Sequence, residues 1–387
     1  MYDNIWVGKN LSYKSSVCQY FGRKHFACAK CVEVCPQKAL RPGSKSIEID
    51  PELCTDCGDC VAICPSGAIT QRITSRQLIV DQLKNHKGAV LVICEQTSWD
   101  HSIKPDLAVE KHLPSGVEPI LVENAGMLSE NDFAQAIMTS RRAVVVLALG
   151  EDSKERPYAR AAEFTGQITA HLFARRLLYV FSDVKNFWAR IPEIAESSEC
   201  EQLPKTFSVP EDLEKRETFR FILSKWLSAA NITTSHPLVI PHPSFATITC
   251  DDTKCILCGA CANQCKVDAL CIVPTGDKLI HTPIDCLNCG ACVDVCPEKA
   301  LSSDNGLHLD RSFLSRREIA QSSVLRCPEC GRPFTTVKRS QKVSSILKTA
   351  LGDDPIRQEL LGLCPECRTK KAFFTYADWT AQKQSKR

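Results

Sequence analysis

Eight of the cysteines between residues 255 and 296 form two copies of the spacing Cys-x2-Cys-x2-Cys-x3-Cys. Thiolates at this spacing hold two [4Fe–4S] clusters, because three on one loop reach one cube and the fourth ligates the other. A disulfide framework or a zinc site would not require the same spacing twice. The run therefore predicts two ligand sets: Cys255, Cys258, Cys261 and Cys296 for cluster 3, and Cys265, Cys286, Cys289 and Cys292 for cluster 4.

The spacing occurs earlier in the chain as well, once complete and once without its first cysteine. The complete copy contains Cys54, Cys57, Cys60 and Cys64, and the incomplete copy contains Cys28, Cys31 and Cys35. The same exchange of fourth cysteines predicts cluster 2 on Cys35, Cys54, Cys57 and Cys60, and cluster 1 on Cys28, Cys31 and Cys64. Cluster 1 then needs one further ligand.

Two residues are candidates for the open position of cluster 1. His25 stands at the regular spacing before Cys28, and Cys18 stands ten residues before Cys28. Thiolate is the softer and more usual ligand of a cube, and a longer loop costs little closure entropy. Cys18 is therefore favoured, while His25 remains the alternative, and so does a site that binds no full cube.

Each fourth cysteine leads into a similar tail, which ends in Ala39-Leu40, Ala68-Ile69, Ala269-Leu270 or Ala300-Leu301. On these motifs, residues 18–75 and 250–311 resemble the two-cluster domains of bacterial ferredoxins. The resemblance implies small cluster-binding folds that pass electrons one at a time, with potentials set by burial, charge and hydrogen bonds to sulfur.

The composition restricts the cellular setting and the partners. The chain has 387 residues, 24 cysteines and a formal charge of +3, so no strongly charged partner such as nucleic acid is expected. The N-terminus lacks a signal pattern, and the apolar runs at 89–94 and 143–149 are too short to span a bilayer. A cytoplasmic chain with reduced thiols is expected, so its cysteine motifs indicate metal rather than disulfides.

Residues 76–234 lack cysteine clusters and alternate between short apolar strands and helical patterns. Strands are expected at 89–94, 119–122, 143–149 and 177–181, with a helix from a Ser129–Asp132 capping box and a longer one over 155–176. This alternation predicts a doubly wound parallel sheet. Neither a G-x-G-x-x-G nor a Walker motif occurs, so a docking and spacing role is favoured over flavin or nucleotide binding.

The order of these elements resembles the delta subunit of methyl-viologen-reducing hydrogenases and domains of formate dehydrogenase and heterodisulfide reductase assemblies. The delta-subunit pattern places several cysteines here, whereas this stretch contains only Cys94 and Cys200. Cys94 is expected to pack as a small hydrophobic residue. A proline-rich linker, residues 235–249, leads into the second cluster domain.

Two matched Cys-Pro-Glu-Cys motifs follow in residues 312–387. They contain Cys327, Cys330, Cys364 and Cys367, which predict a zinc ribbon with one tetrahedral structural ion. A single iron atom in the same four-thiolate cage is the alternative. Similar motifs follow the ferredoxin domains of iron–sulfur subunits in hydrogenase and formate-oxidising complexes.

These patterns predict a multidomain α/β protein. Dicluster domains at 1–75 and 250–311 would flank the sheet domain at 76–234, with the zinc ribbon after them. The sequence predicts a polyferredoxin with four [4Fe–4S] clusters and one zinc, without a substrate active site of its own. Its partners would be redox enzymes or electron carriers, and the resemblance favours a formate dehydrogenase or hydrogenase complex. A maturation factor for a metal enzyme and a cluster-based redox sensor are the alternatives.

Overall fold

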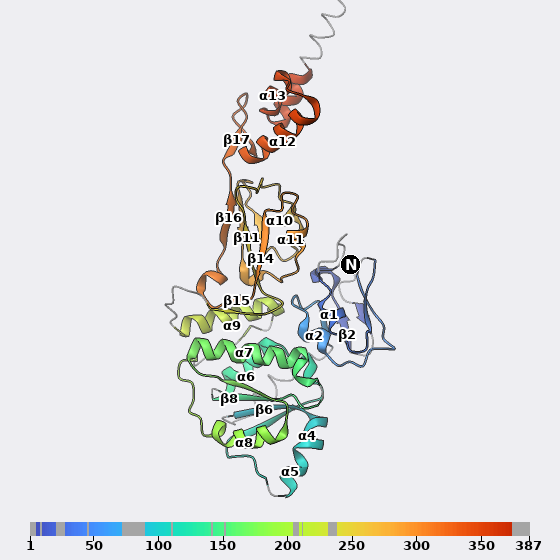
Figure 1. Ribbon diagram of the computed structural model, residues 1–387, viewed down its shortest axis with the longest axis vertical. Helices are drawn as coiled ribbons and strands as arrows, with labels where there is room; N and C mark the ends of the chain where they lie inside the picture. Colours follow the sequence, from blue (N-terminus) through green and yellow to red (C-terminus); the bar gives the residue numbers. More distant parts are fainter. Residues whose placement is uncertain are drawn as a thin grey trace, which may run out of the picture. The chain divides into compact units, whose positions relative to one another are not determined.

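A computed structural model describes residues 5–7, 10–20, 28–44, 46–71, 90–109, 111–140, 142–150, 152–203, 209–210, 212–230 and 238–373 (Figure 1). The chain divides into two compact units. Unit 1 comprises Met1–Ala246, Leu287–Cys289 and Asn305–Leu314, and unit 2 comprises Thr247–Cys286, Gly290–Asp304 and Ser315–Arg387. Within the described ranges, no helix has the length and hydropathy needed to cross a membrane.

A four-stranded parallel sheet forms the centre of unit 1. Its strand order is β7-β6-β8-β9. The strands are β6 (Val90–Glu95), β7 (Val117–Val122), β8 (Ala143–Leu147) and β9 (Leu178–Phe181). The buried apolar runs suit strands covered on both faces. The four strands predicted from the sequence and their parallel pairing are therefore confirmed, apart from shifts of one or two residues at their ends.

Helices cover both faces of this sheet. On one face, Trp99 and Phe187 pack with the side chains of Val90, Val92 and Val145. The helices that supply this layer are α4 (Gln96–Ser102), α5 (Lys104–Val109) and α8 (Val184–Ala195). The other face is covered by α6 (Glu130–Ser140) and α7 (Pro157–Phe173) (Figure 1). The domain is thus wound on both faces, as the alternation of elements predicted.

Capping interactions fix the N-terminal ends of three helices in unit 1. At α6, the Asp132 carboxylate accepts hydrogen bonds from the Ser129 amide at 2.8 Å and hydroxyl at 2.7 Å. Proline at the first position of α7 needs no backbone partner there. Helix α9 (Lys215–Ala229) begins with a capping box between Glu214 and Glu217. These caps set where the N-terminal ends of α6, α7 and α9 begin.

The first dicluster domain also lies in unit 1. It consists of the sheet β1 (Ile5–Val7), β2 (Leu11–Tyr13) and β5 (Ile69–Gln71), the hairpin β3 (Leu40–Pro42) and β4 (Ile47–Ile49), and the short helices α1 (Lys30–Glu33) and α2 (Asp59–Ile63). The 3-10 turn η1 (Ser15–Val17) leads to Cys18. Its core combines apolar side chains such as Leu11 and Ile69 with the cysteines themselves. Such a small core needs additional cross-links, which bound clusters would supply.

The second dicluster domain lies largely in unit 2 and repeats this plan. Its strands are β11 (Ala246–Cys250), β14 (Leu301–Asn305), β12 (Leu270–Ile272), β13 (Lys278–His281) and β16 (Arg317–Gln321). Its helical turns are α10 (Ala260–Gln264), η4 (Pro283–Asp285) and α11 (Ala291–Asp294). Buried His281 joins β13 to its neighbours, because its Nε2 accepts from Ile248 N at 3.0 Å and its Nδ1 lies 3.0 Å from Ala269 O.

Short elements complete each unit. In unit 1, β10 (Val239–Ile240) pairs with β15 (Leu307–His308), and η5 (Arg311–Leu314) follows. In unit 2, the hairpin β17 (Val324–Arg326) and β18 (Pro333–Thr336) precedes the helices α12 (Val337–Leu351) and α13 (Pro355–Leu361). The second Cys-Pro-Glu-Cys motif begins a further helical stretch. This C-terminal segment is therefore more helical than a ribbon built from two β-hairpins.

Candidate metal centres

The four cysteines predicted for cluster 2 line one hollow in the first dicluster domain. Cys35 comes from the end of the first motif, and the other three come from the loop before α2 and from its first turn. Leu11, Ala39 and Leu40 form the apolar part of the wall. Four thiols around one hollow, backed by an apolar wall, are the donor set that a cube requires.

The backbone of the complete cysteine loops follows one repeated pattern. Asp56, Leu257 and Asn288 occupy the same place in their loops and have φ angles of 54°, 56° and 49°. The glycines that follow the second cysteine, Gly58, Gly259 and Gly290, have φ angles of 81°, 81° and 78°. The left-handed conformation at these places curls the loop around the hollow, and glycine adopts it without strain.

The repeated tails contribute hydrogen bonds to sulfur. The amides of Ala39, Ala68 and Ala300 donate to the Sγ atoms of the cysteines four residues earlier, at 3.3, 3.2 and 3.3 Å. In the third copy, which has Lys266 where the others have proline, the amide of Leu270 donates to Cys265 Sγ at 3.4 Å. Such bonds stabilise negative charge on a ligand sulfur, so the tails have an electrostatic role besides packing.

The structure brings Cys18 to the other cysteines predicted for cluster 1. Cys18 is buried, and the charges of Cys64 and Cys18 both act on Cys28 and Cys31. Burial, followed by these neighbouring thiols, raises the pKa of Cys31. His25, the alternative ligand, lies outside the described residues. Cys18 thus lies near the other cysteines of its predicted set, and its role as the fourth ligand stays a prediction.

The four cysteines predicted for cluster 3 also line one hollow, with Ile272 and Leu279 in its wall. A hydrogen bond from Cys250 helps to lower the pKa of Cys255 to about 6, which favours the thiolate that ligates iron. Cys250 itself lies outside the predicted cluster spacing. Cys271, the other cysteine outside the spacing, accepts from Arg316 Nη2 at 3.1 Å.

Helix α12 contributes cations to the loops around this hollow. Arg339 donates to Leu257 O, Lys338 Nζ lies 2.7 Å from Asp252 Oδ1, and Lys342 Nζ lies 2.8 Å from Glu298 Oε2. Sequence reasoning missed these residues because the contacts span 44 to 86 residues and follow no spacing. Of the set predicted for cluster 4, Cys289 belongs to unit 1, and Cys265, Cys286 and Cys292 belong to unit 2.

The loop of cluster 2 is docked on the carboxyl edge of the parallel sheet. Arg156, just before α7, donates to Asp59 Oδ1 at 3.1 Å, to Glu95 Oε1 at 3.3 Å and to Cys57 O at 3.2 Å. Asn124, which follows β7, donates to Asp56 O at 2.6 Å. The chain leads from β6 to β7 on one side and from β8 to β9 on the other, so the crevice at the carboxyl ends of β6 and β8 is the usual ligand site of such a sheet. Here, a cysteine loop from the dicluster domain occupies it.

The fit at this edge leaves no space for an added atom. A Cβ on Gly126, in the turn η2 (Ala125–Met127), would lie 1.9 Å from Cys57 O. A Cβ on Gly58 would lie 2.5 Å from Met127 N. The loop is further held by Lys215 Nζ, which donates to Val61 O and Ala62 O at 3.1 and 2.6 Å. These contacts were not predictable from the sequence, where Arg156 and Gly126 belong to no motif.

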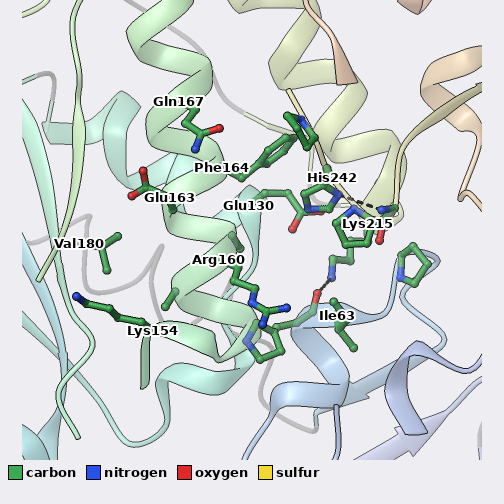
Figure 2. Close-up of a pocket in the computed structure, with 18 residues that line it drawn as sticks. Ile63, Glu130, Lys154, Arg160, Glu163, Phe164, Gln167, Val180, Lys215 and His242 are labelled. Carbon is green, nitrogen blue, oxygen red and sulfur yellow. Dashed lines mark hydrogen bonds between the residues drawn. The ribbon is translucent and has the colours of Figure 1, made fainter. Parts of the chain in front are cut away.

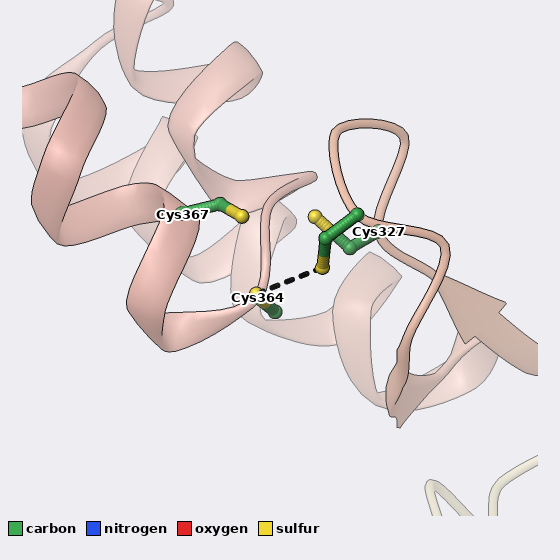
Figure 3. Close-up of side chains that lie close together, drawn as sticks. Cys327, Cys364 and Cys367 are labelled. Atoms are coloured by element: carbon green, nitrogen blue, oxygen red, sulfur yellow. Dashed lines mark hydrogen bonds between the residues drawn. The ribbon is translucent and has the colours of Figure 1, made fainter.

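The C-terminal motifs bring four sulfur atoms together. The Sγ atoms of Cys327, Cys330, Cys364 and Cys367 all lie within 4.8 Å of one another. Figure 3 shows the sulfur atoms of both motifs turned toward each other, and Cys330 Sγ lies 3.7 Å from Cys364 Sγ. Tetrahedral thiolates at about 2.3 Å from zinc would be separated by about 3.8 Å. The donor set therefore fits a single tetrahedral ion.

Comparison with known proteins identifies the two cysteine regions. Residues 26–68 and 254–300 each match the model of the 4Fe-4S dicluster domain family. The chain is 51% identical over 41 residues to a protein named Ferredoxin 7Fe from Hydrogenibacillus schlegelii, which covers 11% of this chain and 53% of that protein. It is 49% identical over 43 residues to a ferredoxin from Alicyclobacillus acidocaldarius subsp. acidocaldarius, covering 11% and 55%.

The chain thus spans about half the length of the curated relatives it matches, and the matched segments cover a small part of its own length. The two family matches fall on the two regions whose cysteine spacing repeats. The protein therefore contains two 4Fe-4S dicluster domains of the ferredoxin type, one in each half of the chain.

Proposed function

We propose that this protein is an electron-transfer polyferredoxin that carries four [4Fe–4S] clusters. The observation that carries the proposal is that four predicted cysteines line one hollow in each dicluster domain. Amide donors to sulfur and left-handed loop residues accompany these hollows, and they suit a charged cluster. The ligand sets are those predicted from the spacing, with Cys18 as the fourth ligand of cluster 1. When bound, each cluster supplies one-electron redox chemistry.

The proposal includes a place in a larger assembly. The resemblance of the sheet domain to subunits of hydrogenase and formate dehydrogenase complexes favours such an enzyme as the redox partner. The docking of the cluster 2 loop on this domain agrees with a role as a scaffold for electron transfer. Co-purification of the tagged chain from its native host, followed by assay for hydrogen- or formate-dependent dye reduction, would test this partner.

The C-terminal cysteines are proposed to hold one structural zinc ion. Their sulfur spacing supports a tetrahedral ion, and zinc is the usual occupant of two such paired motifs. A single iron atom would fit the same geometry. Metal analysis and the visible spectrum together distinguish the two ions, because iron in a four-thiolate site absorbs visible light whereas zinc does not.

The first experiment is metal analysis of the full chain purified without oxygen. Four cubes require about 16 iron and about 16 sulfide per chain, together with about one zinc. A count near 15 iron would indicate a three-iron cluster at one site. Zinc well above one with little iron would contradict the proposal.

A matched pair of variants tests which residue is the fourth ligand of cluster 1. Cys18→Ala is expected to remove about four iron atoms, whereas His25→Ala is expected to leave the iron count unchanged. The opposite result would make His25 the ligand. A nitrogen ligand would also raise the cluster potential, as histidine does in Rieske centres.

One observation favours a second function, that of a maturation factor with a labile cluster. The incomplete first loop places Ala29, with φ −130°, before α1, whereas the complete loops place a left-handed glycine before the matching helix. A cage built differently from the others could release its cluster. About 12 iron as purified, with transfer of the missing cluster to an apo-protein, would support this function; stable reversible potentials for all clusters would exclude it.

A further inference from the structure

A cavity of about 550 Å³ opens in unit 1 beside the turn that carries Cys64 (Figure 2). Its wall comes from the N-terminal half of α7, from Ile63 and Pro65, and from residues 241–244. This volume lies within the range of about 300–1,000 Å³ that is typical of small-molecule sites. No cysteine lines the cavity, so it is separate from the predicted metal centres.

One end of the cavity is aromatic, and Lys215 lies beside its histidine (Figure 2). The rings of Phe164 and His242 have centroids 4.2 Å apart, and Phe245 supports Phe164 from behind at 5.8 Å. The Ser244 amide donates to His242 Nδ1 at 3.1 Å, which places the imidazole proton on Nε2. Burial lowers the pKa of His242 to about 4, so this ring is neutral near pH 7.

The other end carries two cations, Lys154 and Arg160, and one carboxylate, Glu163. Lys154 and Arg160 are exposed at the mouth, and Figure 2 shows them on the side away from His242. Arg160 contacts Glu155 through one nitrogen, and a guanidinium has five N–H donors, so donors remain for a ligand. Figure 2 shows the Lys154 amine turned away from Arg160, so an anion of about phosphate size would meet the guanidinium of Arg160.

A buried carboxylate lies between these two ends. Glu130, the first residue of α6, is 8% exposed, and Figure 2 shows its carboxylate between Arg160 and His242. Burial opposes its charge, but the positive charge of Lys215, the first of several favourable contributions, leaves the pKa of Glu130 below its usual value. An ionised carboxylate in the wall can accept a hydrogen bond from a ring N–H group.

We propose that this cavity binds a planar aromatic molecule that bears a phosphate group and has the size of a mononucleotide. The ring would contact Phe164 and His242, its N–H group would donate to Glu130, and the phosphate would meet Arg160. Flavin mononucleotide and adenosine monophosphate share this chemistry. The proposal goes beyond electron transfer by the clusters, and it places the ligand next to the residues that flank Cys64, a predicted ligand of cluster 1.

A ligand site at this location needs no glycine-rich nucleotide-binding motif. The usual crevice at the carboxyl edge of the sheet is occupied by the cluster 2 loop, and no glycine lines the cavity beside α7. The ring and the phosphate would instead meet side chains from three separate segments. Such a site leaves no compact signature in the sequence.

Binding is tested by calorimetry on the full, cluster-loaded chain without oxygen. The probes are flavin mononucleotide, riboflavin, adenosine monophosphate and inorganic phosphate. At least one of the two mononucleotides is expected to bind with a micromolar Kd, and phosphate alone at least 100-fold more weakly. If one mononucleotide binds more tightly than the other, that preference identifies the ring. If riboflavin binds at least 10-fold more weakly than flavin mononucleotide, the phosphate group contributes to binding.

Variants link binding to the cavity. Arg160→Gln is expected to weaken mononucleotide binding about 10-fold and to leave riboflavin binding unchanged. Arg190→Gln, at an exposed arginine of α8 paired with Glu193, is the matched control and should have no effect. Phe164→Leu should weaken the binding of both flavin mononucleotide and riboflavin. Because Phe164 is buried, the cluster absorbance of this variant is measured first, to show that the protein is still folded.

Two results would overturn the proposal: neither mononucleotide binds at 1 mM, or Arg160→Gln and Arg190→Gln bind equally well. Iron and sulfide are measured on the same samples. A chain with about 16 iron and no mononucleotide binding would retain the electron-transfer function and lose only the cavity ligand, so the two failures are distinguishable.

Discussion

A single tyrosine hydroxyl lies against the sulfur atoms predicted for cluster 1. Tyr13 is 3% exposed, and its hydroxyl has no oxygen or nitrogen partner with hydrogen-bond geometry among the described residues. Cys18 is its neighbour, and burial, then this sulfur, raises the pKa of Tyr13. A buried hydroxyl normally requires an acceptor, and a cluster-bound thiolate would provide one.

Tyr13→Phe is therefore expected to lower the reduction potential of cluster 1 by roughly 20–60 mV, because a hydrogen bond to sulfur favours the reduced, more negative state. Potentiometric titration followed by electron paramagnetic resonance measures the shift. Tyr20→Phe is the matched control, since the Tyr20 hydroxyl donates to Gly43 O at 2.8 Å. Equal shifts in both variants would remove Tyr13 from this role.

His242 makes the stability of unit 1 depend on pH. Its folded pKa of about 4 lies below the unfolded value of about 6.5, so the unfolded chain binds more protons between these values. Burial is the main cause; Arg216, Lys30 and Lys215 add to it, and Glu130 opposes it. The stability from this residue is complete above pH 6.5 and is lost as the pH falls toward 4.

The free energy of unfolding of the wild type should therefore fall more steeply over this range than that of His242→Gln, which carries no titrating ring. Denaturant melts of unit 1 at several pH values, followed by the fluorescence of its tryptophans, test this expectation. Parallel pH profiles for the two proteins would show that His242 is not the titrating group.

At the residue scale, the two dicluster regions were predictable because cluster ligation fixes both residue type and spacing. Cys18 was chosen from ligand softness, because no spacing rule reaches it, and its role as a ligand stays a prediction. Tyr13, Arg156 and Glu130 were not predictable, since their roles depend on which segments meet in space. Arginine and glutamate are ordinary surface residues until the fold buries them.

Arg156 is the principal link between the dicluster domain and the sheet. It joins Asp59 from α2 to Glu95 from β6, and burial alone would favour the protonated form of Asp59. Removing one partner of a buried ion pair costs about 3–5 kcal/mol, because the other charge is left unpaired. Arg156→Met is expected to destabilise unit 1 by about that amount.

In a unit of this size, the loss corresponds to an apparent Tm lower by roughly 6–20 °C. Scanning calorimetry at one heating rate compares the variants. The double variant Arg156→Met with Asp59→Asn should recover part of the loss, because no buried charge then remains. Arg190→Met removes a surface pair and should change the Tm by less than about 2 °C. An unchanged Tm in Arg156→Met would contradict this role.

Helix α12 is expected to tune cluster 3. A cation near the cluster stabilises the reduced state, so Arg339→Met should lower its potential by roughly 20–50 mV. Potentiometry of cluster 3 measures this shift. Arg357→Met on α13, where the arginine pairs with Asp354, is the control and should leave the potential unchanged. A shift of the same size in both variants would point to overall charge instead.

At the element scale, the strands of the sheet were predictable from short buried apolar runs, and their parallel pairing from the alternation with helices. The docking of α2 on the carboxyl edge was not predictable. It depends on close packing between Gly58 and Gly126, where the absence of two side chains permits the approach. A glycine by itself does not indicate in a single sequence that another segment packs closely against it.

The iron–sulfur and single-ion parts of the molecule should respond separately to metal removal. Neither α12 nor α13 has a buried residue, and the core below the four cysteines is limited to Cys327, Leu363 and Cys364 with three partly buried neighbours. A bound ion would therefore supply most of the stability of this segment. A zinc chelator should make residues 324–373 sensitive to protease while the cluster absorbance stays constant.

Limited proteolysis with mass spectrometry locates the cuts. Cys364→Ser should reproduce the effect without chelator, and Cys200→Ser, at a buried cysteine of the sheet domain, should not. Simultaneous loss of cluster absorbance would show that the ion and the clusters are not independent.

The close fit between Gly126 and the Cys57 carbonyl has a consequence for how the protein matures in a cell. The sheet domain has an apolar core that needs no metal, so it can form before iron arrives. The cysteine loop fits this edge closely, so a loop that needed its cluster to reach this shape would dock only after the cluster is bound. A chain without the second cluster would leave Arg156 and Glu95 without Asp59 and would expose the loop to degradation. Docking on the sheet domain would then separate chains that hold this cluster from chains that lack it, and the chains that lack it would be degraded.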